Sequence, residues 1–201
     1  MNIEFQIFFP KTLNDAYRLL DQYGENAKII AGGQSLTPMI NLGLIAPTYL
    51  IDLSRIPGLT EIKEDNGGGL SVGSLATHAA VASSSLVKQK CMLLSQTASQ
   101  IGDVQIRSRG TIGGSVCHAD PAADYPAAAV ALNATMELSN QKGTRVVPAA
   151  EFFQGMYETA LQPNDVLTRV IVPASPVKSG SAYMRLCYVH GAFPIVSVAA
   201  V

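Results

Sequence analysis

The sequence predicts an α+β protein in which a small N-terminal βαβ unit precedes a larger α+β unit with a mixed sheet. Within residues 1–55 a strand, helix, strand, turn, helix and strand follow one another, an order typical of parallel pairing. Beyond them, strands and helices no longer alternate regularly, which favours an α+β arrangement. We therefore predict units at residues 1–55, 56–175 and 176–201, the last being the start of a truncated C-terminal domain.

The first unit has clear element signals. Thr12 followed by Asp15 resembles a capping box with Asp in place of Glu. Apolar residues at helical spacing come next, and Gly24 closes the helix. Residues 28–31 and 49–53 are short apolar runs and predict two buried strands.

The larger unit starts with a hairpin signal. Glycines and Asp-Asn at residues 65–69 separate two strand-like runs, 60–63 and 70–73. Thr77 is a good cap for a short helix, and a second helix is expected over residues 93–101 before Gly102.

Residues 105–124 show little apolar periodicity, so we expect a long loop there. Long loops inside compact domains are usually functional or disordered, and the glycines and polar residues of this one favour function. Residues 173–180 are expected to form a linker. The other expected elements are an Ala-rich helix from Asp124 to Leu132 and strands at 135–138, 145–147, 166–172, 182–189 and 196–201.

Composition excludes several classes of protein. The 201 residues are enough for one or two domains without disulfide or metal staples. A net charge of −1 without any basic run argues against nucleic-acid binding. No run of about 18 apolar residues occurs, so no membrane span is expected.

The cysteines point to a reducing compartment. Cys91, Cys117 and Cys187 are scattered and form no C-x-x-C pair, so this chain alone holds neither a zinc finger nor an iron–sulfur cluster. An odd number of scattered thiols fits the cytoplasm better than a secreted scaffold. Residues 1–10 lack the basic and apolar regions of a signal peptide. We therefore expect a cytoplasmic protein.

Two glycine-rich turns, residues 31–36 and 111–115, combine paired glycines with small hydroxyl residues. Glycine lets the backbone approach a ligand closely, and successive free N–H groups form an anion-binding concavity. The pair therefore predicts one diphosphate held by amides from both sides. The chain lacks the Walker and G-x-G-x-x-G patterns, and an ordinary βα turn is the alternative for the first motif.

Polar residues near the second turn are further candidates. Asp120 and Asp124 could accept hydrogen bonds from ribose or ribityl hydroxyls, while Asp124 could equally be a helix-start carboxylate. Arg107 and Arg109 could balance phosphates, although a solvated surface position is the stronger expectation. The histidines are far apart in sequence, each a weak candidate for a ligand or base: His78, His118 and His190.

Residues 31–36, 105–115 and 119–124, in this order, resemble the FAD-binding subunit of molybdenum-containing hydroxylases. This is the medium chain of complexes of the carbon-monoxide-dehydrogenase and xanthine-dehydrogenase type. The resemblance spans essentially the whole chain and implies a flavin domain of the p-cresol methylhydroxylase/vanillyl-alcohol oxidase (PCMH) type. It further implies a [2Fe–2S] small subunit that delivers electrons, a molybdopterin-binding large subunit, and an external electron acceptor.

The resemblance also implies which residues hold FAD. One side of the diphosphate would be held by Ala31, Gly32, Gly33, Gln34, Ser35 and Leu36, and the other by Thr111, Ile112, Gly113, Gly114 and Ser115. Asp124 would bind ribityl or ribose hydroxyls, and Ile101, Gly102 and Leu167 would lie beside the adenine half. Cys117 would lie near the isoalloxazine ring, with a buried inert thiol as the alternative. No catalytic residue and no metal ligand is predicted.

The chain departs from the family at three places. Ser108 and Ser115 stand where the family often has Asn. Residues 185–190 lack the Arg-Arg pair common in the family, and its C-terminal domain does not follow Val201.

Two other functions remain open from the sequence. One is a self-contained flavin oxidoreductase of the same fold that acts directly on a small molecule. The other is a non-catalytic nucleotide-binding assembly module that kept the fold.

Overall fold

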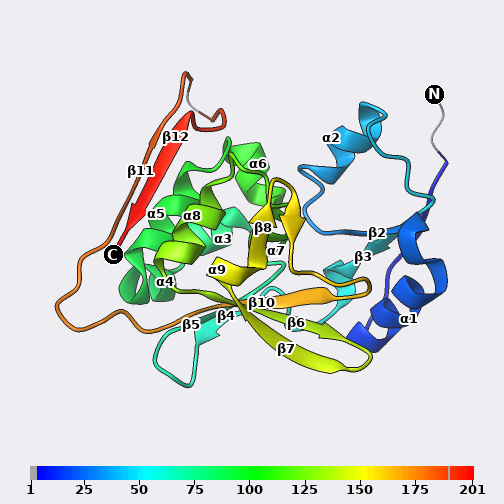
Figure 1. The fold of residues 1–201 in the computed structure, drawn as a ribbon, viewed down its shortest axis with the longest axis horizontal. Coiled ribbons are helices and arrows are strands. Elements are labelled where there is room, and N and C mark those ends of the chain that lie inside the picture. Colours follow the sequence, from blue (N-terminus) through cyan, green and yellow to red (C-terminus); the bar gives the residue numbers. More distant parts are fainter. Residues whose placement is uncertain (1–3, 190) are drawn as a thin grey trace.

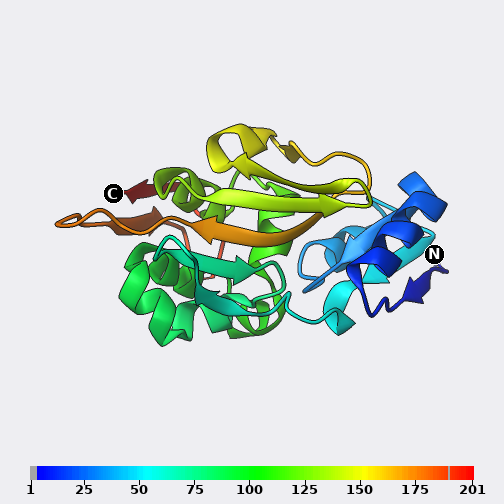
Figure 2. The ribbon, with the colours of Figure 1, turned by 90° about the horizontal axis from the view of Figure 1, so that it is seen from below.

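The computed structural model of the chain describes residues 4–189 and 191–201. Three parts lie in a row: an N-terminal unit, a central sheet with its helices, and a C-terminal hairpin at the opposite end (Figures 1 and 2). His190 lies outside the described residues. No helix among those described is long and apolar enough to cross a bilayer.

The N-terminal unit is the predicted βαβ arrangement. Its three strands pair in parallel in the order β1–β3–β2. The first helix begins as predicted, because the Thr12 hydroxyl accepts a hydrogen bond of 3.1 Å from the Asp15 N–H. The elements are β1 (Gln6–Phe8), α1 (Leu13–Tyr23), β2 (Ala27–Ile30), α2 (Leu36–Asn41) and β3 (Tyr49–Asp52), with short 3-10 turns at Gly24–Asn26 and Leu53–Arg55.

The central sheet has five strands in the order β4–β5–β10–β6–β7. Every neighbouring pair of strands is antiparallel, so the prediction of a mixed sheet for this unit is wrong. The predicted α+β class is confirmed. The reason is that β4–β5 and β6–β7 are hairpins and β10 runs opposite to both of its neighbours. The strands are β4 (Ile62–Glu64), β5 (Leu70–Gly73), β6 (Thr135–Asn140), β7 (Gly143–Pro148) and β10 (Val166–Val172).

Helices pack against this sheet to form the main core. Val72 and Met136 of the strands and Leu93, Ile112 and Tyr125 of the helices are at most 1% exposed and belong to one apolar cluster. The helices are α3 (His78–Ser83), α4 (Ser85–Lys90), α5 (Met92–Gln100), α6 (Val104–Arg109), α7 (Ile112–His118), α8 (Asp124–Ala131) and the short α9 (Ala149–Phe152).

The long loop expected over residues 105–124 is wrong, because α6 and α7 occupy most of it. Both helices have side-chain caps: Asp103 accepts from the Ile106 N–H at 2.8 Å, and Thr111 accepts from the Gly114 N–H at 3.1 Å. The two glycines of α7 lower its intrinsic helix propensity. Burial of its apolar side, with Ile112 at 1% exposure, outweighs that cost.

The N-terminal unit is packed tightly against the central unit. A second apolar cluster joins Ala16 and Ile51 of the first unit to Leu59, Leu75 and Val166 of the second. This packing brings the loop that follows β2 to the edge of the central unit (Figure 1).

The C-terminal hairpin pairs β11 (Ala182–Leu186) with β12 (Val196–Ala200) and lies on α5 and α8. The first strand ends earlier than the predicted residue 189. A smaller hairpin, β8 (Phe153–Gly155) with β9 (Glu158–Thr159), follows α9.

Candidate functional site

The two glycine-rich segments are in contact. A Cβ atom built on Gly32 would lie 2.2 Å from the carbonyl oxygen of Arg109 and 2.7 Å from the Cα of Gly110, so only glycine fits at position 32. A Cβ atom on Gly114 would lie 3.8 Å from the Cβ of Ala31. Figure 1 shows the loop after β2 directed toward α6 and α7.

A cavity of about 200 Å³ lies between these segments. Pockets for whole drug-sized ligands are typically about 300–1,000 Å³, so this one suits a compact group within a larger ligand. Five of its lining residues carry hydroxyls, one is an arginine and none is acidic, which favours an anion. The cavity is lined by Ala31, Gly32, Ser54, Thr60, Leu75, Thr77, Ser108, Arg109 and Thr111.

Sequence reasoning missed part of this lining. Ser54, Thr60, Leu75 and Thr77 belong to no recognisable motif, and only the fold brings them to the cavity. The one local signal was the cap at Thr77, which accepts the Ala80 N–H and thereby fixes where α3 begins.

The first loop offers free amides. Among the described residues, no acceptor pairs with the backbone N–H groups of Gly32, Gly33, Gln34 and Ser35. Gly33 has a φ of +73°, which favours glycine, and the Gln34 side chain donates to the Gly32 carbonyl at 3.1 Å. These four residues are half-buried, and their N–H groups are available to the acceptors of a ligand. Successive unpaired amides in a turn are an anion-binding arrangement.

The second turn differs from the expectation that both segments offer amides. The N–H groups of Ile112 and Gly113 donate to the carbonyls of Ala76 and Ser74 at 3.0 and 2.9 Å. Those of the next two residues donate to the hydroxyl and carbonyl of Thr111. Of the backbone N–H groups of residues 111–115, only that of Thr111 has no acceptor among the described residues, so a ligand can meet this turn through that N–H and the Thr111 hydroxyl. Contacts of FAD with residues 111–115 stay a prediction.

Ile101 and Gly102 lie at the end of α5 and are held by an arginine. The Nη1 of Arg107 donates to the carbonyl oxygens of both residues, at 2.9 and 2.8 Å. Arg107 is half-buried, so its expected solvated position is wrong, whereas Arg109 is exposed. The contact of residues 101 and 102 with adenine stays a prediction.

Asp124 lies at the start of α8 and is 4% exposed. Its Oδ1 accepts from the Tyr183 hydroxyl at 2.5 Å and from Arg185 Nη1 at 3.0 Å, and Oδ2 lies 3.1 Å from the same nitrogen. Burial raises the pKa of Asp124, and the hydrogen bonds from Tyr183 and Arg185 oppose that rise. This carboxylate already has protein partners, and its contact with a ribityl or ribose hydroxyl stays a prediction.

Two predicted contacts lie in or against the main core. Leu167 of β10 is 4% exposed within it, and Cys117 of α7 packs against it. Burial raises the pKa of the Cys117 thiol to about 12, so it is a thiol and not a thiolate near neutral pH. Their contacts with FAD stay predictions.

His78 belongs to the wall behind the second turn. Burial, and secondarily the charge of Arg107, lowers the pKa of His78 to about 4. Its Nδ1 lies 3.2 Å from the Tyr125 hydroxyl, and a Cβ on Gly110 would lie 2.7 Å from its Nε2. The ring of His118 packs on Tyr157 instead. Among the described residues, no three His, Cys, Asp or Glu side chains gather as a metal site would require.

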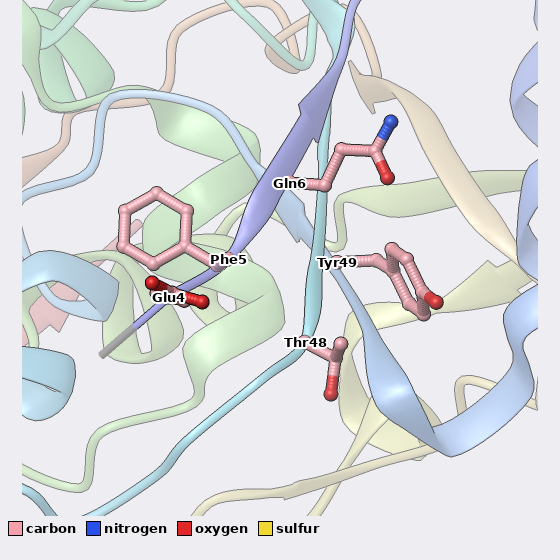
Figure 3. A pocket seen from close by; sticks show the side chains of 5 residues that line it. All are labelled: Glu4, Phe5, Gln6, Thr48 and Tyr49. Carbon is pink, nitrogen blue, oxygen red and sulfur yellow. The ribbon is translucent and has the colours of Figure 1, made fainter. Parts of the chain in front are cut away.

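A larger pocket of about 560 Å³ lies elsewhere, at the start of β1 and β3. Figure 3 shows Phe5 on one side of β1 and Gln6 and Tyr49 on the other, with Glu4 and Thr48 at the near end. None of the predicted site residues lines it.

Comparison with known protein families gives a match that covers most of the chain. Residues 3–175 match the family described as the FAD binding domain in molybdopterin dehydrogenase. The chain belongs to this family. The resemblance predicted from the motifs is thereby confirmed, as is FAD as the cofactor.

Relatives of this FAD-binding domain include the carbon monoxide dehydrogenase medium chain of Hydrogenophaga pseudoflava, 41% identical over 90% of this chain and 63% of that protein. Another is the 6-hydroxypseudooxynicotine dehydrogenase complex subunit alpha of Paenarthrobacter nicotinovorans, 36% identical over 98% of this chain and 66% of that protein. A structure of the Hydrogenophaga carbon monoxide dehydrogenase lacking the Mo-pyranopterin moiety superposes with a TM-score of 0.92, at 39% identity over 95% of this chain and 66% of that one. The chain thus spans less than two thirds of the length of these relatives.

Proposed function

We propose that this chain is the FAD-binding subunit of a multi-subunit molybdenum hydroxylase. Electrons would pass from a [2Fe–2S] subunit through FAD to an external acceptor, while a molybdopterin-binding large subunit oxidises the organic substrate. The observation that carries the proposal is the meeting of a free-amide loop with the Thr111 hydroxyl in one cavity without acidic residues.

The cavity suits the diphosphate of FAD. The amides of Gly32 to Ser35 are donors without protein acceptors, and phosphate oxygens are strong acceptors. A side chain at Gly114 would fill the space between Thr111 and Ala31, since its Cβ would lie 2.9 Å from the Thr111 hydroxyl oxygen. Glycine at this position keeps that space available to a ligand.

When bound, the flavin supplies the redox chemistry, and the protein supplies binding and orientation. The first loop would hold the diphosphate by its amides, and Thr111 would approach it from α7. The turn at Ile101 and Gly102 would lie beside the adenine half. The Asp124 carboxylate, which accepts hydrogen bonds from Tyr183 and Arg185, would lie beside a ribityl or ribose hydroxyl of the ligand.

Partners and compartment follow from the same proposal. The described cysteines are unpaired and separate, so the iron–sulfur cluster would come from another chain. We place the complex in the cytoplasm, in keeping with these free thiols.

The test is the composition of the complex purified with the full-length chain. We expect one FAD per chain, together with iron, acid-labile sulfide and molybdenum carried by two further subunits. A preparation with no flavin would contradict the proposal. A single flavoprotein chain that is bleached by a substrate would instead indicate a self-contained oxidoreductase.

A further inference from the structure

The end of α5 is held by two arginines that are far apart in sequence. Arg185 of β11 donates from Nη1 to the carbonyl oxygen of Gln100 at 2.6 Å. Arg107 donates to the next two carbonyls, those of Ile101 and Gly102. The last carbonyls of a helix lack partners within the helix, so these bonds define the position of the turn that follows α5.

The same Arg185 also reaches the start of α8. Its Nη1 pairs with both carboxylate oxygens of Asp124, and both side chains are 4% exposed. Its Nη2 donates to the carbonyl of Ala192 in the hairpin loop. Arg185 Nε is also buried, and no acceptor for it lies among the described residues. One buried guanidinium thus joins the C-terminal hairpin, the end of α5 and the start of α8.

A buried ion pair of this kind contributes little net stability, because desolvation offsets much of the attraction. The planar guanidinium of Arg185 carries several N–H donors in a fixed arrangement, which is suited to holding several acceptors in one geometry. The acceptors here are Asp124, which was assigned to ribityl or ribose hydroxyls, and Gln100. Gln100 directly precedes the Ile101–Gly102 turn, which was assigned to the adenine half of FAD.

We propose that Arg185 is a positioning residue for FAD. It holds the Asp124 carboxylate and the turn after α5 at the spacing that the dinucleotide requires, so the C-terminal hairpin takes part in cofactor affinity without contacting FAD through this side chain. This inference rests on the proposed FAD-binding function.

The test is a titration of the full-length chain, freed of its flavin, with FAD, followed by quenching of flavin fluorescence. Arg185→Lys keeps the charge but loses the fork, and we expect it to raise the Kd for FAD about tenfold, the effect of losing one charge-assisted hydrogen bond. Tyr183→Phe removes only the Tyr183 hydroxyl that donates to Asp124, and it should raise the Kd for FAD by less than Arg185→Lys does. It provides the answer if the lysine variant does not fold.

A double-mutant cycle separates positioning from general stability. If Arg185 acts through Asp124, Arg185→Lys should weaken FAD binding clearly less in an Asp124→Asn background than in the wild type. The matched control is Arg145→Lys, since Arg145 of the edge strand β7 pairs with Asp165 at 2.6 Å, lines no part of the candidate site and should leave the Kd for FAD unchanged.

Three results would overturn the inference: an unchanged Kd in both Arg185→Lys and Tyr183→Phe, full additivity with Asp124→Asn, or an equal loss in Arg145→Lys. A wild-type chain that binds no FAD would instead refute the proposed function.

Discussion

In the loop after β2, the N–H groups of Gly32, Gly33 and Gln34 have no acceptor among the described residues. In the turn that begins α7, the N–H groups from Ile112 to Ser115 all donate to the protein itself. Both segments contain paired glycines and a hydroxyl residue. The difference shows that such a pattern locates a close approach of backbones without revealing whether a ligand or the protein makes that approach.

The glycines follow the same division. Gly113 is required by packing, because its Cβ would lie 2.5 Å from the Cβ and 2.6 Å from the carbonyl oxygen of Ser74. Gly33 is required by its backbone conformation and leaves its N–H available. Substitutions in the second turn should therefore change the stability of the chain more than its FAD affinity. Substitutions in the first loop should change the FAD affinity more than the stability.

The largest effect is expected at Gly113. Gly113→Ala forces α7 away from Ser74 and should lower the free energy of unfolding by about 3 kcal/mol, the upper range for overpacking. Denaturant unfolding of the FAD-free chain measures it. Gly180→Ala, which introduces a Cβ with nothing within 4 Å, is the control and should cost little. Equal stability of the two variants would mean that the second turn is not built into the core.

A pH effect comes next, through His78 behind the second turn. Its pKa is lowered to about 4, whereas the unfolded chain titrates near 6.5. As the pH falls from about 6.5 toward about 4, His78 binds a proton in the unfolded state but not in the folded state. The free energy of unfolding therefore decreases as the pH is lowered. The loss from pH 7 to pH 5 should be about 2 kcal/mol. In His78→Gln this part of the pH dependence should vanish; an unaltered stability–pH curve would show that the ring is not buried as a neutral group.

A smaller effect is expected at Thr111, which belongs to both the protein and the cavity. Thr111→Val removes the cap on the Gly114 N–H and should cost about 1 kcal/mol of stability. It should also raise the Kd for FAD. Thr12→Val removes the matching cap of α1, remote from the cavity, and should cost a similar amount of stability with no change in FAD affinity. Equal FAD affinities in the two variants would remove Thr111 from the site.

Much of the fold could be predicted because local signals agreed with tertiary packing. Thr12 caps α1, and the β-branched run of residues 166–172 forms β10. The signals for α6 and α7 were also local, in Asp103 and Thr111, but glycines and polar residues hid the helical periodicity. Those helices exist because their apolar residues find a core that the sequence does not display.

The site could be predicted only in part. The first loop was readable, since a strand leading directly into paired glycines indicates a turn whose backbone approaches another group closely. The pairing of Asp124 with Arg185, 61 positions away, was not, because nothing local to either residue indicates the other. Nor did the sequence distinguish the two uses of glycine, which depend on what lies opposite each N–H in the folded chain.

The central claim is that the amides of the loop after β2 hold the diphosphate. Gly33 and Gly43 have φ values of +73° and +70°, so alanine strains both backbones alike, by about 1–2 kcal/mol. They differ in space, because a Cβ on Gly33 would lie 3.0 Å from the Thr37 hydroxyl oxygen whereas one on Gly43 meets nothing within 4 Å. Only Gly33 lies in that loop. The decisive measurement is the Kd for FAD of Gly33→Ala beside that of Gly43→Ala, each corrected for its folded fraction. We predict a rise of at least about tenfold for Gly33→Ala and none for Gly43→Ala; equal affinities would contradict the account.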